Sequence, residues 1–285
     1  MALSLWSFFS CSKESALPQE QRALQFSTVE SKSNLSLPFT TFKVWGEVCV
    51  ASSSEPLPLI QGYKVNYINN QWSYTQGVGT EEQKMKYWSY SADQYRFHAG
   101  APFDRVEKIT ASSLTLQVNA TTSQGGTTLF TQPYVVKRGD AQFGNTVNLK
   151  FTYANCRVNV AVKCKASKEV KVSDIKLTPP ASVYYLTSCT MQLSYDWSRQ
   201  SISLTSLTKQ SEANAPLEFA EITIPAESAN SVESSSPLYM IPDAGITGQW
   251  RATLKIDGIA REVLFTVDKG WESGKSYIYS FLYTD

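Results

Sequence analysis

The chain has 285 residues and a formal net charge of +1, because 26 Lys and Arg face 25 Asp and Glu. Nucleic-acid binding needs a concentrated basic surface, and no basic or acidic block is present in this sequence. The length fits two domains better than one, since a domain usually holds about 100–200 residues.

An uncharged apolar run opens the chain, from Leu3 to Phe9, and it stops at Cys11. The run is too short to span a bilayer, which takes roughly 20 apolar residues, but it has the length of a signal-peptide core. Its layout resembles a bacterial lipoprotein signal, which is cut before a cysteine that then receives the lipid. On that interpretation Cys11 is the lipidated first residue, and 1–22 is a signal followed by a flexible tether. The alternative is an ordinary cleaved signal in which Cys11 is incidental.

After the tether the sequence reads as short strands separated by turn residues. Apolar and polar residues alternate with a period of two, which is typical of half-buried strands, and helical periodicity is almost absent. The clearest alternating segments are 24–27, 42–50, 63–67, 114–118, 147–164, 175–177, 202–204, 222–224, 250–256, 259–267 and 277–283. The sequence therefore predicts an all-β protein.

Within the segment from Val147 to Cys164 the apolar positions change parity. They are odd up to Tyr153 and even from Cys156 onward. One extra residue moves every later side chain to the other face of a strand, so we expect a β-bulge or a tight bend at Ala154-Asn155.

Two features stand out near the C-terminal end. Asp257-Gly258 separates two alternating runs and predicts a tight hairpin, because a type I′ turn needs positive φ at both central residues. In the segment 277–283 both faces are apolar, which predicts a central strand or a strand that fills a groove in a partner.

The best domain boundary is the segment Gly139–Gly144. It divides the chain after the tether into an N-terminal β-sandwich at 23–143 and a C-terminal β-sandwich at 144–285. Each part is long enough for seven or eight strands.

Four cysteines remain besides Cys11: Cys49, Cys156, Cys164 and Cys189. They could form two disulfides in an oxidising compartment, or they could be small buried strand residues. On one extended strand Cys156 and Cys164 would lie roughly 26 Å apart, too far to bridge each other.

The sequence contains little that indicates a catalytic site. His98 is the one histidine, which disfavours a Ser-His-Asp arrangement and a two-His zinc site. Glu81-Glu82 and the pair Glu218 and Glu221 suggest paired carboxylates by composition alone. No metal-ligand spacing or nucleotide-binding loop is present, so we expect no cofactor, no metal and no enzymatic activity.

The aromatic residues are a stronger functional signal. Trp72, Tyr74, Tyr87 and Trp88 cluster in the first half of the chain. Exposed Trp and Tyr stack on sugar rings or on a partner surface, which makes these four residues candidate ligand or partner contacts. The alternative is that they form the core, since large aromatic side chains are usually buried.

Five segments of the sequence resemble motifs of the fimbrillin-like proteins, the pilins and adhesins of Bacteroides-type bacteria. They are Cys11 with its flanking serines, the progression from Asn70 through Trp72, Trp88 and Phe97 to Pro102, the segment 147–160, the run Leu238-Tyr239-Met240-Ile241-Pro242, and the closing segment from Trp271 through Gly274-Lys275 to Tyr279. Two residues after Phe151, where the family usually has His, this chain has Tyr153.

The resemblance implies two tandem transthyretin-like β-sandwich domains in a lipoprotein displayed on an outer membrane or in a fimbrium. It also implies other fimbrial subunits as partners and trimming of the N-terminal segment by an Arg-directed protease. The strand lost by trimming would leave a groove, which a strand from the next subunit fills. Arg22 is the only Arg before Arg96, which makes it the candidate trimming site. It could equally be an ordinary tether residue.

Three functions therefore compete. The first is a non-catalytic fimbrial subunit or accessory adhesin that contacts host proteins or glycans. The second is a surface lipoprotein that binds glycans through exposed Trp and Tyr. The third, a hydrolase of envelope polysaccharide, lacks a recognisable acid and base.

Overall fold

The computed structural model describes residues 22–30, 38–75 and 83–284, so the predicted signal, Cys11 and Glu81-Glu82 lie outside the described residues. Strands form nearly all of the regular structure in these ranges. Three short 3-10 turns join them: η1 (Phe103–Arg105), η2 (Gln124–Gly126) and η3 (Ala244–Ile246). The all-β prediction is confirmed for this part of the chain. No helix within it is long and apolar enough to cross a membrane.

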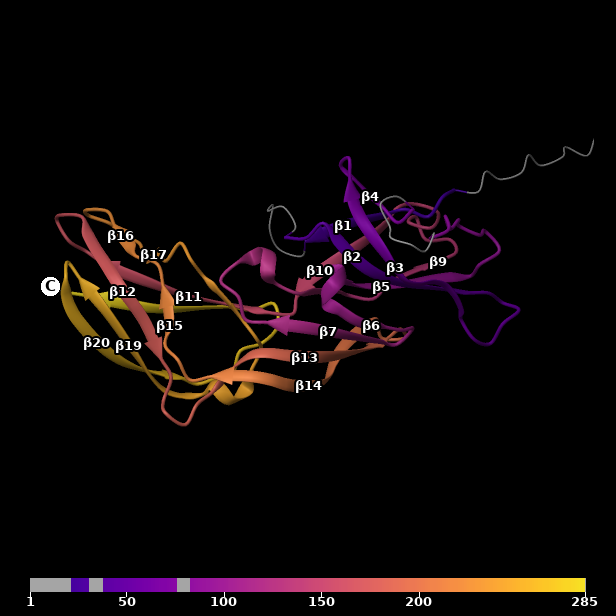
Figure 1. Cartoon of the computed structure of the whole chain (residues 1–285). Helices are drawn as coiled ribbons and strands as arrows, with labels where there is room; N and C mark the ends of the chain where they lie inside the picture. Colours follow the sequence, from indigo (N-terminus) through magenta and orange to yellow (C-terminus); the bar gives the residue numbers. More distant parts are fainter. Residues whose placement is uncertain (1–21, 31–37, 76–82, 285) are drawn as a thin grey trace, which may run out of the picture.

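The first sheet has the strand order β1, β10, β8, β5, β2, β3 and β4, with β9 also paired to β5. The bounds are β1 Phe26–Glu30, β2 Thr41–Cys49, β3 Leu57–Ile68, β4 Gln71–Ser73, β5 Gln94–Ala101, β8 Leu129–Thr131, β9 Tyr134–Lys137 and β10 Val147–Tyr153. β1 runs parallel to β10, and the other ladders of this sheet are antiparallel. The sheet curls so that its two end strands, β1 and β4, come into contact (Figure 1).

The second sheet packs against one face of the first. Its order is β14 (Ser201–Ala213), β13 (Tyr185–Asp196), β7 (Ser113–Asn119) and β6 (Val106–Ile109). The approach of the two sheets is close, because a Cβ added at Gly100 of β5 would lie only 2.8 Å from Cγ2 of Val106. Both sheets take strands from either side of residue 143, and the division into 23–143 and 144–285 stays a prediction about folding units.

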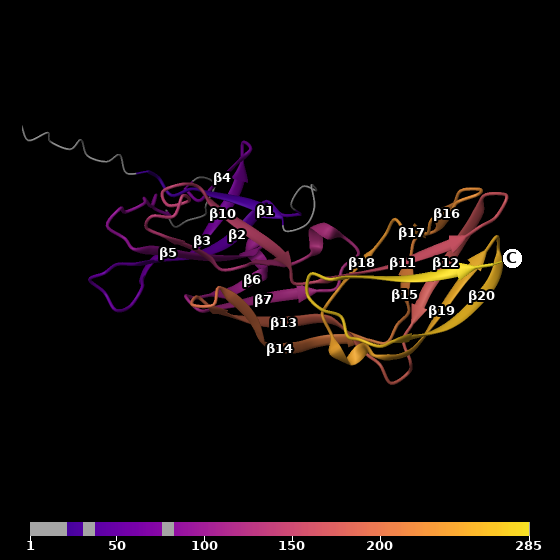
Figure 2. The ribbon, with the colours of Figure 1, turned by 180° about the vertical axis from the view of Figure 1, so that it is seen from behind.

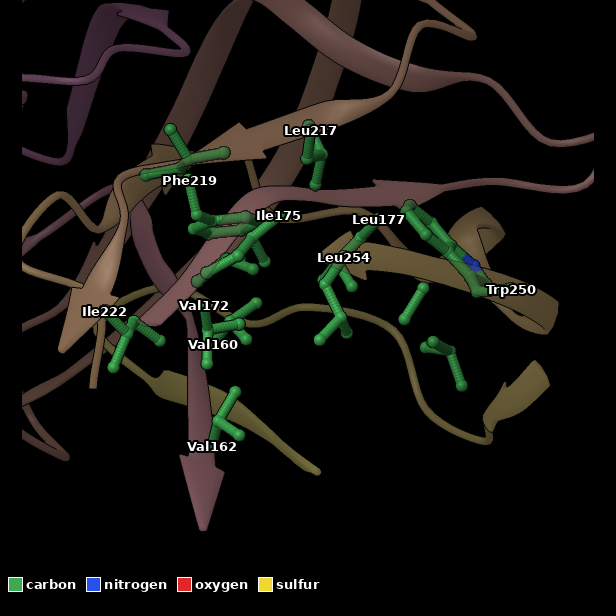
Figure 3. Packing of buried hydrophobic residues seen from close by; sticks show 14 of the residues in the cluster. Val160, Val162, Val172, Ile175, Leu177, Leu217, Phe219, Ile222, Trp250 and Leu254 are labelled. Carbon is green, nitrogen blue, oxygen red and sulfur yellow. The ribbon is translucent and has the colours of Figure 1, made fainter. Parts of the chain in front are cut away.

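The last two sheets enclose a separate core. In the third sheet, β11 (Cys156–Cys164) pairs with β21 (Ser276–Tyr283) on one side and with β17 (Val232–Glu233) and β18 (Leu238–Met240) on the other. The fourth sheet contains β12 (Val170–Thr178), β15 (Leu217–Phe219), β16 (Ile222–Ile224), β19 (Gly248–Ile256) and β20 (Ile259–Val267). Side chains of β11, β12, β15, β16 and β19 meet between these sheets (Figure 3). Figures 1 and 2 show the two pairs of sheets at opposite ends of an elongated molecule.

At the predicted change of parity the chain makes a tight bend, which is one of the two alternatives expected from the sequence. Ala154 and Asn155 form the bend, and the chain passes there from β10 in the first sheet to β11 in the third. The Asn155 side chain is buried: its Oδ1 accepts from the Thr128 N–H at 3.0 Å, and its Nδ2 donates to the Asn119 carbonyl at 2.9 Å. The amide therefore ties the bend to two neighbouring segments.

The Asp257-Gly258 hairpin is also confirmed. The two residues join β19 to β20 and have φ of 48° and 82°, so both lie in the left-handed region that a tight hairpin requires. The Asp257 carboxylate accepts from the Lys171 N–H at 3.0 Å, which attaches the turn to β12. The hydrogen bond from Lys171 lowers the pKa of this carboxyl.

The last strand is not central. β21 pairs with β11 in parallel from Ser276 to Tyr283, and among the described strands β11 is its only ladder partner. One of the two alternatives from the sequence, a strand buried between two neighbours, is therefore excluded within this chain.

Replacing Asn155 with Ala should lower the free energy of unfolding by about 1–3 kcal/mol, because it leaves the Thr128 N–H and the Asn119 carbonyl buried without this partner. Urea denaturation followed by tryptophan fluorescence measures the change. Asn145→Ala is the control, since its amide is exposed where it donates to the Ala141 carbonyl and its loss should cost less than about 0.5 kcal/mol. Equal stabilities of the two variants would contradict the role given to Asn155.

Candidate functional site

Tyr74 is a buried clamp for the start of the described chain. Its hydroxyl donates to the Leu24 carbonyl at 2.9 Å and accepts from the Lys86 N–H at 3.0 Å. Its ring packs edge-on against Phe26 at 5.8 Å, and burial raises the pKa of the Tyr74 hydroxyl. The residue therefore holds the segment before β1 against the first sheet and has little surface to offer a ligand.

Trp88 belongs to the core of the first sheet. Its side chain is 1% exposed, and its ring lies 4.6 Å from Tyr95 and 5.4 Å from Phe143. Its backbone N–H donates to the Arg22 carbonyl at 3.0 Å. Its indole therefore lies out of reach of a ligand or partner, as the core interpretation expects.

Trp72 and Tyr87 reach the surface. Trp72 is half-buried on β4, where it faces Tyr67 across the hairpin with ring centroids 5.0 Å apart. The turn of this hairpin is Asn69-Asn70, in which both residues have positive φ, as a type I′ turn requires. Tyr87 is exposed and forms an isolated bridge with Ala23.

A pocket of about 380 Å³ lies beside β4, where the end strands of the first sheet meet. We call it the β1–β4 pocket. Its lining consists of Leu24, Gln25, Ile68, Asn69, Gln71, Trp72, Ser73, Tyr74, Thr75 and Met85. Two of the four predicted contact residues, Trp72 and Tyr74, thus lie together here, whereas Tyr87 and Trp88 do not line it.

Arg22 is exposed at the beginning of the described chain, just ahead of β1. A surface hollow of about 320 Å³ adjoins it, lined also by Ala23, Gln25 and 144–146. After Arg22 the chain enters the core at once, because Leu24 and Phe26 are buried. The Arg22 side chain is therefore exposed to solvent, whereas β1 is part of the folded sheet.

His98 is a core residue. It is fully buried on β5, its Nε2–H donates to the Thr110 carbonyl at 2.6 Å, and its ring lies 4.1 Å from Tyr195. Burial lowers the pKa of His98 to about 3, an effect that the hydrogen bond to Thr110 partly opposes. The imidazole is therefore neutral at pH 7, and it joins the first sheet to the second.

Cys49, Cys156 and Cys189 are free thiols, and Cys156, Cys164 and Cys189 are buried. Cys156 and Cys164 lie on the single strand β11, as the spacing predicted. Burial raises the pKa of Cys156 to about 12 and that of Cys189 to about 11, so both remain protonated. Within the described ranges no group of His, Cys, Asp and Glu is arranged to hold a metal ion.

Exposed apolar side chains gather on the two edge strands β20 and β21. Ile259, Val263 and Leu264 lie on β20, and Ile278 and Leu282 lie on β21. Leu282 has the largest exposed fraction among them, 70%. The inner faces meet where the Phe265 ring lies 5.1 Å from Tyr279 and 5.6 Å from Phe281.

Sequence reasoning missed the polar residues that accompany Trp72. Asn69, Gln71 and Gln25 are exposed at the β1–β4 pocket, and no motif singled them out. The dipeptide Asn69-Asn70 could have pointed to the hairpin, because Asn tolerates the left-handed conformation. Gln25 lines the pocket only because the sheet curls, and no local sequence pattern predicts that curl.

These sheets, with cores between them and no metal-ligand cluster in the described ranges, define an all-β protein of stacked sheets. The model of the fimbrillin-like family matches residues 49–285. Because this match spans well over half of the sequence, the chain belongs to the fimbrillin-like family, and the resemblance found in the sequence is confirmed. No curated protein matches the chain.

The chain is similar to solved structures from Bacteroides. A "putative cell adhesion protein" from Bacteroides ovatus has a TM-score of 0.51 at 12% identity, with 92% of each chain covered. A protein with the same description from Bacteroides uniformis has a TM-score of 0.49 at 12% identity, covering 93% of this chain and 94% of its own. A fimbrial protein from Bacteroides ovatus has a TM-score of 0.44 at 9% identity, covering 91% of this chain and 48% of its own.

The stability of the protein should fall as the pH drops from about 6.5 toward 4, in part through His98. The unfolded chain then takes up a proton that the folded His98, with its pKa of about 3, does not, which costs up to about 1.4 kcal/mol per pH unit. Urea denaturation of wild type and His98→Gln at several pH values measures this contribution. Carboxylates titrate equally in both proteins, so the wild type should lose more stability; parallel curves would disprove the assignment.

Proposed function

We propose that this protein is a non-catalytic fimbrial subunit or accessory adhesin at the cell surface, and that subunits join by β-strand addition. Membership of the fimbrillin-like family supports the first part, as do the adhesion and fimbrial descriptions of proteins with a similar fold. Its partners are then other fimbrial subunits. We further propose that the sheets form two tandem transthyretin-like domains, and that a lipid on Cys11 anchors the protein to the outer membrane.

The observation that carries the assembly proposal is the free edge of β21. Among the described strands, the eight residues from Ser276 to Tyr283 pair only with β11, so the backbone donors and acceptors on the other side of β21 are available to a partner. Exposed Ile278 and Leu282 lie on the outer face of the same strand. A strand from another subunit would gain both main-chain hydrogen bonds and apolar contacts there.

Natural proteins protect sheet edges with charges or proline, and β21 has neither. Its sequence from Ser276 to Tyr283 contains only Ser, Tyr, Ile, Phe and Leu. Two other long edge strands do contain charges: β14 has Lys209 and Glu212, which form an ion pair, and β20 has Arg261 and Glu262. This contrast favours β21 as the edge that accepts a partner.

Trimming after Arg22 would leave the first sheet intact. Leu24 and Phe26 are buried beyond the cut, and Tyr74 and Lys86 hold Leu24 by hydrogen bonds at 2.9 and 2.8 Å. We therefore propose that a cut at Arg22 detaches the protein from its anchor and opens no groove at β1.

Lysine substitutions on the outer face of β21 should abolish assembly. In Ile278→Lys/Leu282→Lys, two charges would be buried by an added strand, whereas the free subunit leaves these positions exposed. Surface material released from native cells is run in SDS with and without boiling; wild type should give a ladder that collapses on boiling, and the variant a monomer band.

The matched control is Leu204→Lys, on the 51% exposed Leu204 of edge strand β14, and it should keep the ladder. Far-ultraviolet circular dichroism checks that each variant folds. A wild-type sample that is monomeric throughout, or a ladder that persists in the β21 variant, would refute strand addition at this edge.

Arg22→Gln should block trimming. Mass spectrometry of wild-type protein released from cells is expected to find an N-terminus at Ala23, with thermal stability unchanged by the cut, because β1 stays paired with β10. Arg199→Gln, at an exposed Arg in the turn between β13 and β14, is the control and should be trimmed normally. A mature N-terminus at Cys11 in wild type would overturn the proposal for Arg22.

A further inference from the structure

We propose that the β1–β4 pocket binds a neutral sugar, as the terminal residue of a glycan. The inference deepens the proposed adhesive function by naming a ligand class and a site. Its first support is position. The curled sheet brings β1 beside β4 (Figures 1 and 2). The lining of the pocket includes Gln25 just before β1 and residues of the β3–β4 hairpin. The volume of about 380 Å³ falls within the range of small-ligand sites, about 300–1,000 Å³.

Trp72 supplies a rigid aromatic surface. Its ring is held by Phe42 and Tyr67, each at 5.0 Å, and by Phe39 at 5.8 Å. Because these neighbours restrict its rotation, the part of the indole that lines the pocket is pre-organised. Sugar rings present an apolar C–H face, for which such an aromatic surface is complementary.

The polar groups at the pocket are amides and hydroxyls. Gln25, Asn69, Gln71 and Thr75 are exposed along it, and Ser73 is half-buried. An amide offers both donors and an acceptor, and a hydroxyl offers one of each. Sugar hydroxyls also donate and accept, so these side chains can form hydrogen bonds with several hydroxyls of one sugar ring.

Among the described residues the lining contains no charged side chain, and this observation favours a neutral ligand. By contrast, the hollow of about 450 Å³ on β12, β19 and β20 is lined by Asp174, Lys176, Lys255, Arg261 and Glu262. There Lys255 Nζ and Asp174 Oδ2 are 2.7 Å apart and already pair with each other. A phosphate or an acidic sugar would find no cation among the described residues that line the β1–β4 pocket.

Saturation-transfer NMR on the full chain in solution tests the proposal. The probes are glucose, galactose, mannose, fucose, N-acetylglucosamine and lactose at millimolar concentrations, with sialic acid and glucuronic acid as charged comparators. We expect at least one neutral sugar to bind, and we expect Trp72→Ala to weaken that sugar by about tenfold or more.

A second variant guards against loss of folding, because Trp72 also packs on Phe39 and Phe42. Gln25→Ala/Gln71→Ala changes only exposed side chains and should weaken the same sugar by about tenfold. The matched control is Gln249→Ala, an exposed glutamine on β19 in the fourth sheet, which should bind like wild type.

The proposal is overturned if no neutral sugar binds, if the charged sugars bind more tightly, or if the double glutamine variant binds like Gln249→Ala. These outcomes are independent of assembly, because the test uses monomer in solution. Loss of the SDS ladder would count against strand addition at β21 and would leave the sugar site standing. A missing sugar signal with an intact ladder would count against the sugar site and would leave strand addition at β21 standing.

Discussion

The arrangement of the sheets depends on the bend between β10 and β11, which the buried side-chain amide of Asn155 fixes by hydrogen bonds. Oδ1 accepts from Thr128 ahead of β8, Nδ2 donates to Asn119 at the end of β7, and the backbone carbonyl accepts from the Gly274 N–H at 2.9 Å. One residue thus connects the first sheet, the second sheet and the segment that leads into β21. An unpaired buried amide is costly, so this bend has one favourable arrangement.

From that bend the order of the chain in space follows. β10 closes the first sheet beside β1, and β11 then begins a new sheet whose inner face is opposite in parity. The chain later returns through β13 and β14 to cover the first sheet, where the Tyr195 hydroxyl donates to the Thr131 carbonyl at 3.1 Å and the His98 ring packs on Tyr195. Residues far apart in sequence therefore share one core.

Local patterns sufficed for the local features of this fold. Period-two alternation predicted many of the strands but missed others, including β5 and β13. Asp257-Gly258 predicted the hairpin, and the parity change predicted a bulge or bend at Ala154-Asn155. Pairing partners were beyond such reasoning, because nothing in the sequence of β13 shows that it pairs with β7 and β14 rather than with β11. For the candidate site, composition pointed to four aromatics but could not separate buried Trp88 from half-buried Trp72, since that depends on which strand lies beside each residue.

The two parallel ladders give the protein a particular response to tension. β1 runs alongside β10 from Phe26 to Glu30, and β21 runs alongside β11 from Ser276 to Tyr283. A pull that draws Arg22 and Thr284 apart along these strands acts on both ladders in shear, so their hydrogen bonds share the load and must break together rather than one by one. A surface protein held at one end and pulled by flow at the other would experience this geometry of force.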